Sequence, residues 1–335
     1  MKRRIWTVVN AFAWVIVACL SLWALAALYF DLSWNRFPLL TPILYIGVLA
    51  YLAKQRLPVR SCCIAGFFIV LVCWLSLKPT NHRSWEPNVS ETPWAEIKGD
   101  AVVIHNLRNC SYRTEEDYRC QWLDKTLSLA HLNALDLFVT YWGSPYIAHP
   151  ILSFRFGEND YVAASIEARY QIGKGYSAIR GFFRQYELIY VFAGERDLVE
   201  LRTNYRKGED VYLFHTTAGP DWSRRLFLQY LEEANELHDH AQWYNAATRN
   251  CTTNIFTQMA ATGQLPAGST LHDWWILLNG KGPEVLYRHG NFAGDLPYPE
   301  LMERVHINAA ARASANSRDF SRLIRIGRPG FEISN

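Results

Sequence analysis

The stretch HPILSFRFGENDYVAASIEAR, residues 149–169, predicts two antiparallel strands joined by a short turn. Its two halves, His149–Gly157 and Asp160–Arg169, are rich in β-branched and aromatic residues, and turn-forming residues lie between them. Side chains alternate along a strand, so His149 and Phe154 lie on opposite faces. The hairpin therefore places a histidine at the start of a strand whose other face is apolar.

The register of this hairpin decides which residue faces His149. With a three-residue loop, His149 lies opposite Glu167 or Arg169. A two-residue loop shifts the register by one residue and turns Glu167 to the other face. Glu167 can therefore orient the His149 imidazole in one register only, and Ser165 and Asn250 are alternative candidates for that role.

Further strand-like runs surround this hairpin, each bounded by turn-forming residues. They are Ala101–Leu107, Ala134–Trp142, Tyr186–Gly194 and Asp210–His215. Two amphipathic helices follow, Pro220–Leu237 with Asp221 as its N-cap and a second from about Cys251 to Ala261. This mixture of strands and helices predicts an α+β domain.

The first quarter of the chain is apolar and predicts a membrane anchor in residues 1–78. Apolar runs lie at about residues 5–30, 37–53 and 61–77, and about 20 residues suffice to cross a bilayer. The first run is too long for a cleaved signal peptide, and two more runs follow it. We therefore expect three transmembrane helices.

Basic residues flank these runs unevenly. MKRR precedes the first run, and KQRLPVR, Lys54–Arg60, lies between the second and the third. Basic loops favour the cytoplasmic side of a membrane. The N-terminus is therefore predicted to be cytoplasmic, and the chain after Lys78 is predicted to lie outside.

Composition divides the rest of the chain into three parts. Residues 79–94 contain Pro and Ser and are expected to form a linker, and residues 95–305 hold the α+β domain. Residues 306–335 are polar and basic and are expected to form a loosely ordered tail. The net charge of the whole chain is only +3, which gives no indication of a nucleic-acid partner.

The cysteines fall into three groups. Those inside the apolar runs are expected to behave as small apolar side chains: Cys19, Cys62, Cys63 and Cys73. Cys110 and Cys120 lie in a polar stretch and are predicted to form a disulfide outside the membrane, the alternative being two free thiols. Cys251 is then a single unpaired thiol.

Cys251 is predicted to begin a helix, and this position favours reactivity. Free backbone N–H groups and the helix dipole stabilise a thiolate there. A thiolate nucleophile needs a base that can later donate the proton, and His149 is our candidate. The other histidines considered are expected to have structural or surface roles: His131, His215, His238 and His240. A buried, inert cysteine is the alternative for Cys251.

The sequence contains none of the common motifs for metals or phosphates. It has no C-x-x-C and no H-E-x-x-H motif, and its GKG, Gly173–Gly175, lacks the flanking pattern of a phosphate loop. We therefore expect neither a metal nor a cofactor.

Three segments carry a resemblance to a known family. They are HPILSFRFG from residue 149, YVAASIEARYQIGKGYSAIRGFFRQYELIYVFAGERD from residue 161, and YNAATRNCTTNIF from residue 244. Together they resemble the Lnb-type periplasmic-domain family, over roughly Ala95 to Met259. That family is named for a bacterial lipoprotein N-acylating enzyme and belongs with circularly permuted papain-like proteins, which include NlpC-like enzymes. The resemblance implies a permuted papain-like domain, in which the histidine strand precedes the cysteine helix.

The resemblance also implies an activity and a location. Cys251 would be the nucleophile of an acyl-transfer site and His149 its base, and Glu167 is our choice of third partner. The chain would then be a membrane-bound acyltransferase acting on lipid or lipoprotein through a Cys251 thioester, in the bacterial inner membrane with its domain in the periplasm. The alternatives are a thiol amidase or hydrolase acting on cell-wall peptide, and a non-enzymatic membrane module with a buried Cys251.

Four more residues are candidates for binding a substrate head group or lining the site. They are Arg155, Arg169, Tyr244 and Asn250. Arg155 shares a strand face with His149 if the strand is regular. The alternative for each of the four is a surface or packing role.

Overall fold

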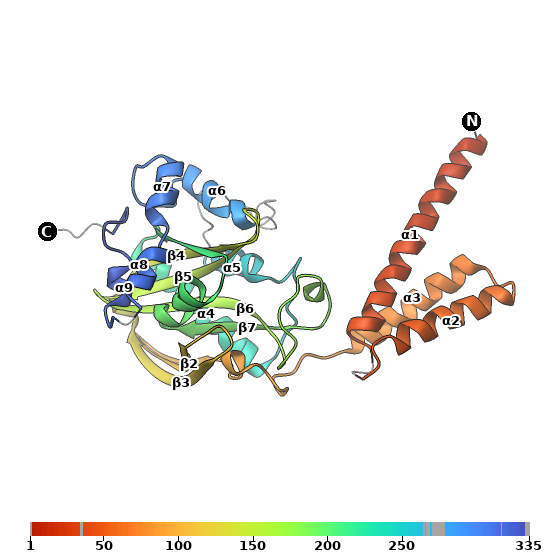
Figure 1. Ribbon diagram of the computed structural model, residues 1–335, viewed down its shortest axis with the longest axis horizontal. Helices are drawn as coiled ribbons and strands as arrows, with labels where there is room; N and C mark the ends of the chain where they lie inside the picture. The colour runs from red at the N-terminus through yellow and green to blue at the C-terminus, as the bar shows by residue number, and fades with distance from the viewer. Residues whose placement is uncertain are drawn as a thin grey trace. The chain divides into compact units, whose positions relative to one another are not determined.

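The computed structural model describes residues 2–33, 36–263, 265, 269, 279–315 and 317–331. The chain divides into two compact units. One comprises Met1–Pro79 and Tyr176–Tyr186, and the other comprises Thr80–Gly175 and Glu187–Asn335. The first unit is helical, whereas the second is built around a large sheet (Figure 1). The second unit confirms the predicted α+β class.

Three apolar helices form most of the first unit: α1 (Lys2–Phe30), α2 (Leu40–Lys54) and α3 (Val59–Ser76). α1 and α3 are long and apolar enough to cross a membrane. α2 has 15 residues. At its usual rise a helix of this length extends about 22 Å, less than the roughly 30 Å of a bilayer's hydrocarbon core. Two helices therefore have the length of a membrane span, and the third expected span is a shorter apolar helix.

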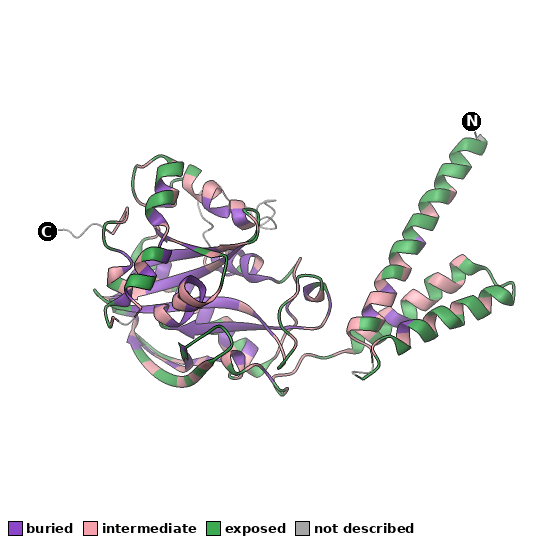
Figure 2. Cartoon of the chain, viewed as in Figure 1, coloured by how far each residue is buried: buried purple, intermediate pink, exposed green. Residues whose placement is uncertain are grey.

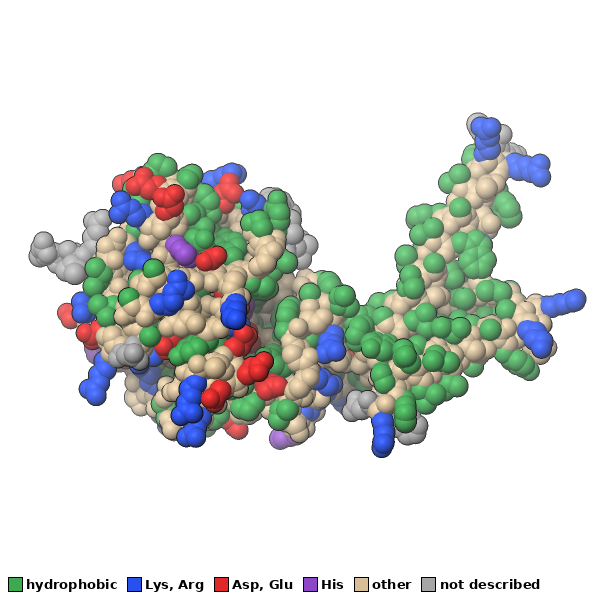
Figure 3. All heavy atoms as spheres, viewed as in Figure 1, with side chains coloured by type: hydrophobic (Ala, Val, Ile, Leu, Met, Phe, Trp, Pro, Cys, Tyr) green, Lys and Arg blue, Asp and Glu red, His purple; other side chains and the backbone are tan. Residues whose placement is uncertain are grey.

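α1 and α3 run side by side in the same direction. Near their N-terminal ends, the Arg60 guanidinium donates hydrogen bonds to the backbone and side-chain oxygens of Asn10 and lies 4.6 Å from the Trp14 ring centroid. Towards their C-terminal ends, the rings of Trp23 and Trp74 meet edge to face at 5.3 Å. Apolar side chains cover much of the visible surface of these helices, and Lys and Arg lie at their ends (Figure 3).

An eight-stranded sheet forms the second unit, in the order β1-β2-β7-β6-β5-β4-β8, with β3 paired to β2. Every pairing is antiparallel except that of β2 with β7. The strands are β1 (Trp94–Lys98), β2 (Ala101–Tyr112), β3 (Tyr118–Ser128), β4 (Leu132–Trp142), β5 (Ala148–Phe156), β6 (Asp160–Arg169), β7 (Glu187–Ala193) and β8 (Glu209–His215).

The β5–β6 hairpin has the register that a three-residue loop requires. Phe156 pairs with Asp160, and the pairing runs back to Ile151 and Ser165. This register puts His149 and Glu167 on the same face of the sheet. The predicted hairpin is therefore confirmed, and of the two registers that the sequence left open the structure has the one in which Glu167 can orient His149.

Helices cover both faces of the sheet, and its strands β4, β5, β6 and β7 are largely buried (Figure 2). On one face, α4 (Pro220–Asp239) packs Phe227 and Tyr230 against Phe154, Phe192 and Tyr190 of the sheet. α5 (Cys251–Ala261) lies beside α4. The other face is covered by the π-helical segment η4 (Arg196–Tyr205) and by α8 (Asn308–Ala313) and α9 (Phe320–Leu323).

Short elements complete the described chain. They are η1 (Pro87–Val89), η2 (Leu129–His131), η3 (Arg180–Phe182), η6 (Asn279–Lys281), α6 (Gly282–Arg288) and α7 (Tyr298–Val305). α4 begins after Gly219 with Pro220 in its first turn, so the predicted N-cap Asp221 is instead a first-turn residue, and it binds Arg224 at 2.9 Å.

Residues 306–331 do not form the expected loose tail. Although these residues are mostly polar, a few apolar side chains among them pack into the core of the sheet. They include Ile307, Ala311, Phe320 and Ile324. Arg325 is also buried and bonds to Asp136 and Glu195. The expected linker at residues 79–94 is likewise packed against the second unit, because Trp85 and Val89 are buried.

The sequence analysis missed strand β3. Its residues alternate between exposed and half-buried positions, so its composition is too polar to indicate a strand. β3 pairs with β2 and brings Cys110 opposite Cys120, and the two are disulfide-bonded.

Candidate active site

Cys251 is the first residue of α5, and its neighbours cap this helix. The Asn250 side chain accepts the Thr253 N–H at 3.0 Å, and the Thr253 hydroxyl accepts the Asn250 N–H at 2.8 Å. The Asn254 N–H donates to the Asn250 carbonyl. Within the described chain, the N–H groups of Cys251 and Thr252 have no acceptor. They lie at the positive end of the helix dipole, where an anion is stabilised.

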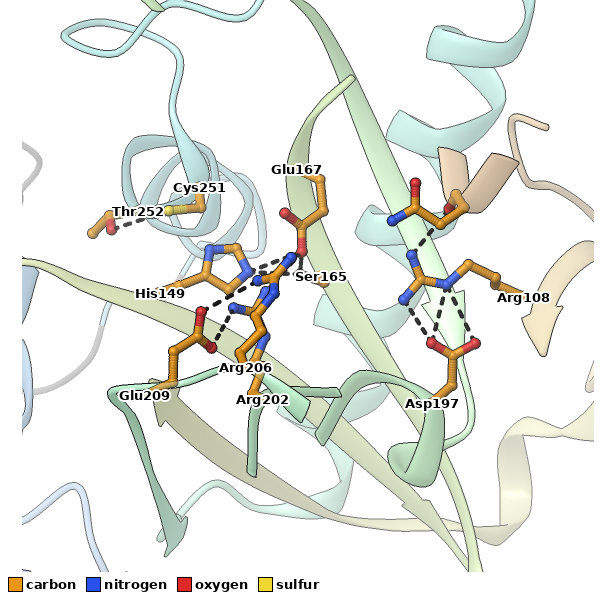
Figure 4. Close-up of polar contacts among 11 residues, drawn as sticks. Arg108, His149, Ser165, Glu167, Asp197, Arg202, Arg206, Glu209, Cys251 and Thr252 are labelled. Carbon is orange, nitrogen blue, oxygen red and sulfur yellow. Dashed lines mark hydrogen bonds and ion pairs between the residues drawn. The ribbon is translucent and has the colours of Figure 1, made fainter. Parts of the chain in front are cut away.

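A separation of two strands makes room for Cys251 beside His149. The pairing of β5 with β6 ends at Ile151 and Ser165, although β5 remains paired with β4 and β6 with β7. β5 and β6 therefore diverge at the end that carries His149 and Glu167. α5 contacts both strands, and Cys251 lies next to the His149 ring (Figure 4).

The other side of the His149 ring faces a compact polar group. Its Nε2 lies 2.7 Å from the Ser165 hydroxyl and 3.2 Å from Glu167 Oε1. The Ser165 hydroxyl donates to the same Glu167 oxygen at 2.6 Å, and Arg202 donates to it at 3.2 Å. Ser165 and Glu167, the two candidates on β6 for orienting the imidazole, thus act together.

This arrangement changes the pKa of both titrating partners. Burial alone would lower the pKa of His149, but the negative charge of Glu167 and the hydrogen bonds with Cys251 and Glu167 outweigh it and raise the pKa to about 9. Burial would raise the pKa of Glu167, but His149, Arg202 and Ser165 hold it well below its usual range. His149 is therefore an imidazolium paired with a carboxylate at neutral pH.

Arg202 contacts the same Glu167 oxygen as His149 and is itself held by neighbouring charges. Arg202 lies on η4, is buried, and also contacts Glu209 at 3.4 Å. Arg206 contacts Glu209 at 3.3 Å (Figure 4). The sequence analysis missed both arginines, because nothing in the local sequence places η4 beside β6.

Asn279 joins the two elements that carry Cys251 and His149. Its side-chain oxygen accepts the Ala148 N–H at 2.8 Å, and its side-chain nitrogen donates to the Thr252 hydroxyl at 3.0 Å. Ala148 precedes His149 and Thr252 follows Cys251, so one amide ties the start of β5 to the first turn of α5. The sequence offered no signal for this residue.

An apolar cavity of about 260 Å³ has Thr252, the residue after Cys251, among its lining residues. β4 and β5 form one wall, on the sheet face that α5 covers, and α5 and α6 form others. The lining is mostly aliphatic and aromatic, and includes Leu137, Leu152, Trp222, Phe256, Met259 and Phe292. Ala148 and Pro150, which flank His149, also line it. Chain neighbours of Cys251 and His149 thus line the cavity, whereas Cys251 and His149 themselves are not among its lining residues.

The four residues predicted to bind a head group or line the site do not all lie at the site. Asn250 caps α5, and Tyr244 is buried. Arg155 lies near the far end of β5 from His149 and bonds to Asn133 at 2.9 Å. Arg169 is buried and donates to the backbone oxygens of Val89 and Ser90 and to a side-chain oxygen. The structure therefore brings Asn250 to the site but not Arg155, and it gives Arg169 structural partners.

The other histidines lie in separate surroundings. His215 binds the buried Asp136 at 2.6 Å, and His238 lies 2.8 Å from the Thr92 hydroxyl. In the part of the chain that the structure describes, no group of three or more His, Cys, Asp or Glu side chains could hold a metal ion. The Cys251–His149–Glu167 group is therefore the described cluster best suited to thiol chemistry.

Fold and site together define a class of protein. It is an α+β domain with a cysteine at a helix N-terminus beside a strand-borne histidine, in a chain that begins with apolar helices able to cross a membrane. Residues 118–280 match the family model described as the Lnb N-terminal periplasmic domain, so this part of the chain is similar to that family. The match spans His149, Glu167 and Cys251. No curated protein and no solved structure matches the chain.

Proposed function

We propose that this protein is a membrane-bound thiol acyltransferase that acts on lipid or lipoprotein through a Cys251 thioester. The observation that carries the proposal is the apolar cavity lined by Thr252, the residue after Cys251. A cavity of this composition suits an alkyl chain, and its position would put the acyl carbonyl close to the Cys251 sulfur. The apolar helices at the start of the chain and the family match support a membrane substrate.

The first half of the reaction would form the thioester. The Cys251 thiolate attacks the acyl carbonyl carbon, and negative charge develops on the carbonyl oxygen. The free N–H groups of Cys251 and Thr252 are suited to stabilise that oxygen. When the intermediate collapses, the bond to the leaving oxygen breaks and His149 gives that oxygen its proton.

The second half would return the thiolate. An amine attacks the thioester carbonyl, and His149, now neutral, accepts a proton from its nitrogen. The carbon–sulfur bond breaks and the acyl group leaves as an amide. Glu167 and Ser165 would hold the imidazole ring in place throughout and stabilise its charged form.

Intact mass spectrometry tests the proposal. The purified full chain is incubated with bacterial membrane lipids, alongside its Cys251→Ala and His149→Ala variants. We expect an acyl adduct that hydroxylamine removes in the wild type, none in Cys251→Ala, and a greatly slowed adduct in His149→Ala. Cys251→Ala retains the free thiols of Cys19, Cys62, Cys63 and Cys73, so it reports any adduct formed at those positions.

Other outcomes would contradict acyl transfer. No adduct, combined with a thiol that reacts with iodoacetamide only when His149 is present, would favour a thiol amidase in which water resolves the acyl-enzyme. No adduct and an inert Cys251 in the folded protein would favour a non-enzymatic module.

A further inference from the structure

The segment Tyr176–Tyr186, with the sequence YSAIRGFFRQY, belongs to the helical unit although it connects two strands of the sheet. It lies between β6 and β7 and contains the short helix η3. Phe183 is buried in an apolar cluster with Ala27 of α1 and Val70 of α3. The segment is therefore packed against the C-terminal parts of the two helices that could cross a membrane.

Asp31, directly after α1, accepts three hydrogen bonds, two of them from this segment and one from α3. It accepts the Trp74 indole N–H at 2.7 Å, the Arg184 backbone N–H at 3.1 Å and the Gln185 side-chain N–H at 2.7 Å. Gln185 also donates to the Phe30 carbonyl at 2.6 Å. These bonds join α1, α3 and the segment at one end of the helices.

Arg184 strengthens the same junction. Its guanidinium lies 4.1 Å from the Trp74 ring centroid and donates to the Leu77 carbonyl at 2.5 Å. An aromatic ring and an arginine at the end of an apolar helix are typical of the layer between hydrocarbon and water. The junction therefore has the composition of a membrane interface.

Several large apolar side chains of the segment are exposed, and one of them, Tyr176, stacks on Tyr186. Ile179 is 65% exposed, Phe182 is 50% exposed and Tyr176 is 51% exposed, whereas the adjacent Phe183 is 7% exposed. Neighbouring aromatic residues thus face opposite ways, one into the helix cluster and one outwards. Exposed apolar groups that continue an apolar surface mark a site of lipid or protein contact.

We propose that Tyr176–Tyr186 is a membrane-interfacial segment whose Ile179 and Phe182 side chains insert into bilayer lipid. The bilayer is the occupant that the structure favours, because the segment is fixed to the ends of helices that could span it. Arg180 adds a positive charge at the level of the lipid head groups. This inference does not depend on the chemistry of Cys251.

Photocrosslinking to lipid tests this inference. The full chain is placed in vesicles of phosphatidylethanolamine and phosphatidylglycerol, with benzoylphenylalanine replacing Ile179 or Phe182. After irradiation, intact mass spectrometry detects the added mass of a phospholipid. The matched control carries the same probe at Ile326, which is 50% exposed in the sheet unit.

We expect several-fold more phospholipid adduct at Ile179 and Phe182 than at Ile326. Equal adduct at all three positions, or protein adducts without lipid at Ile179 and Phe182, would overturn the proposal. If the Phe182 variant does not fold, as judged by its melting curve, the comparison of phospholipid adduct at Ile179 with that at Ile326 tests the proposal. The photocrosslinked phospholipid adducts at Ile179 and Phe182 do not require an active Cys251. Failure of acyl transfer and failure of lipid insertion are therefore distinguishable.

Discussion

At the scale of single residues, the site depends on a charge pair. Glu167 raises the pKa of His149 to about 9, so the imidazolium is the resting form at neutral pH. The stabilisation that this pair gives the fold is present below the ordinary histidine pKa of about 6.5 and is lost as the pH rises through about 9. The proton that His149 would donate to a leaving group is lost over the same range.

The Glu167→Gln variant should move the alkaline limit of activity to lower pH. Wild-type thioester formation is expected to fall as the pH rises through about 9, because His149 then loses its proton. Removing the carboxylate charge should shift that fall towards about 6.5. Rates of acyl-adduct formation from pH 5 to about 10 measure the alkaline limit of the wild type and that of the variant. An unchanged alkaline limb in the variant would contradict the assigned cause.

Asn279→Ala should slow thioester formation by about ten- to a hundredfold, because a small displacement of reacting groups is costly. The variant removes both hydrogen bonds that tie Ala148 to Thr252. The matched control is Asn133→Ala, whose amide bonds to the Gly157 carbonyl away from the site. Equal rates in the two variants would show that the bridge has no role in positioning.

At the scale of elements, the cavity should select the substrate by its acyl chain. Met259 of α5 lines it, so Met259→Trp should shorten the longest chain accepted while sparing short ones. Competition between acyl donors of different chain length, read by intact mass, measures the preference. Met302→Trp on α7, outside the cavity lining, is the control. Loss of all chain lengths alike would indicate misfolding rather than a filled cavity.

The elements nearest the site were the most predictable from sequence. The turn between two β-rich runs predicted the β5–β6 hairpin and narrowed its register to two alternatives, and the helix α5 was predicted to begin near Cys251, as it does. Both signals are local, because turn and cap chemistry depend on adjacent residues.

Features that depend on distant residues escaped prediction. The divergence of β5 from β6 follows from packing with α5, and Arg202 reaches Glu167 from a helix 35 positions away along the chain. The tail was misjudged because its apolar residues are sparse in the sequence and converge only when folded. Burial of Arg325 depends on partners 189 and 130 positions away.

At the scale of the molecule, one buried cation fixes the C-terminal segment to the sheet. Arg325 binds Asp136 at 2.7 Å and Glu195 at 2.5 Å, and all three side chains are buried. Removing one partner of a buried ionic group leaves uncompensated charge and typically costs about 3–5 kcal/mol.

Arg325→Met should therefore lower the free energy of unfolding of the sheet unit by roughly that amount. Urea titration of the full chain in detergent, followed by circular dichroism, measures the change. The control Arg322→Met removes an exposed pair with Asp319 and should change stability by less than about 1 kcal/mol. Comparable losses in both variants would contradict the role of the buried network.

The chain passes between its two units three times, near residues 79, 175 and 186. The segment Tyr176–Tyr186 belongs to the helical unit although its two neighbours along the chain belong to the sheet unit. Limited proteolysis tests the contacts inside the helical unit. A nick near residue 79 would leave two polypeptides associated through the hydrogen bonds of Asp31 with the Arg184–Gln185 segment. The nicked protein would then migrate as one particle until denaturant separates its pieces.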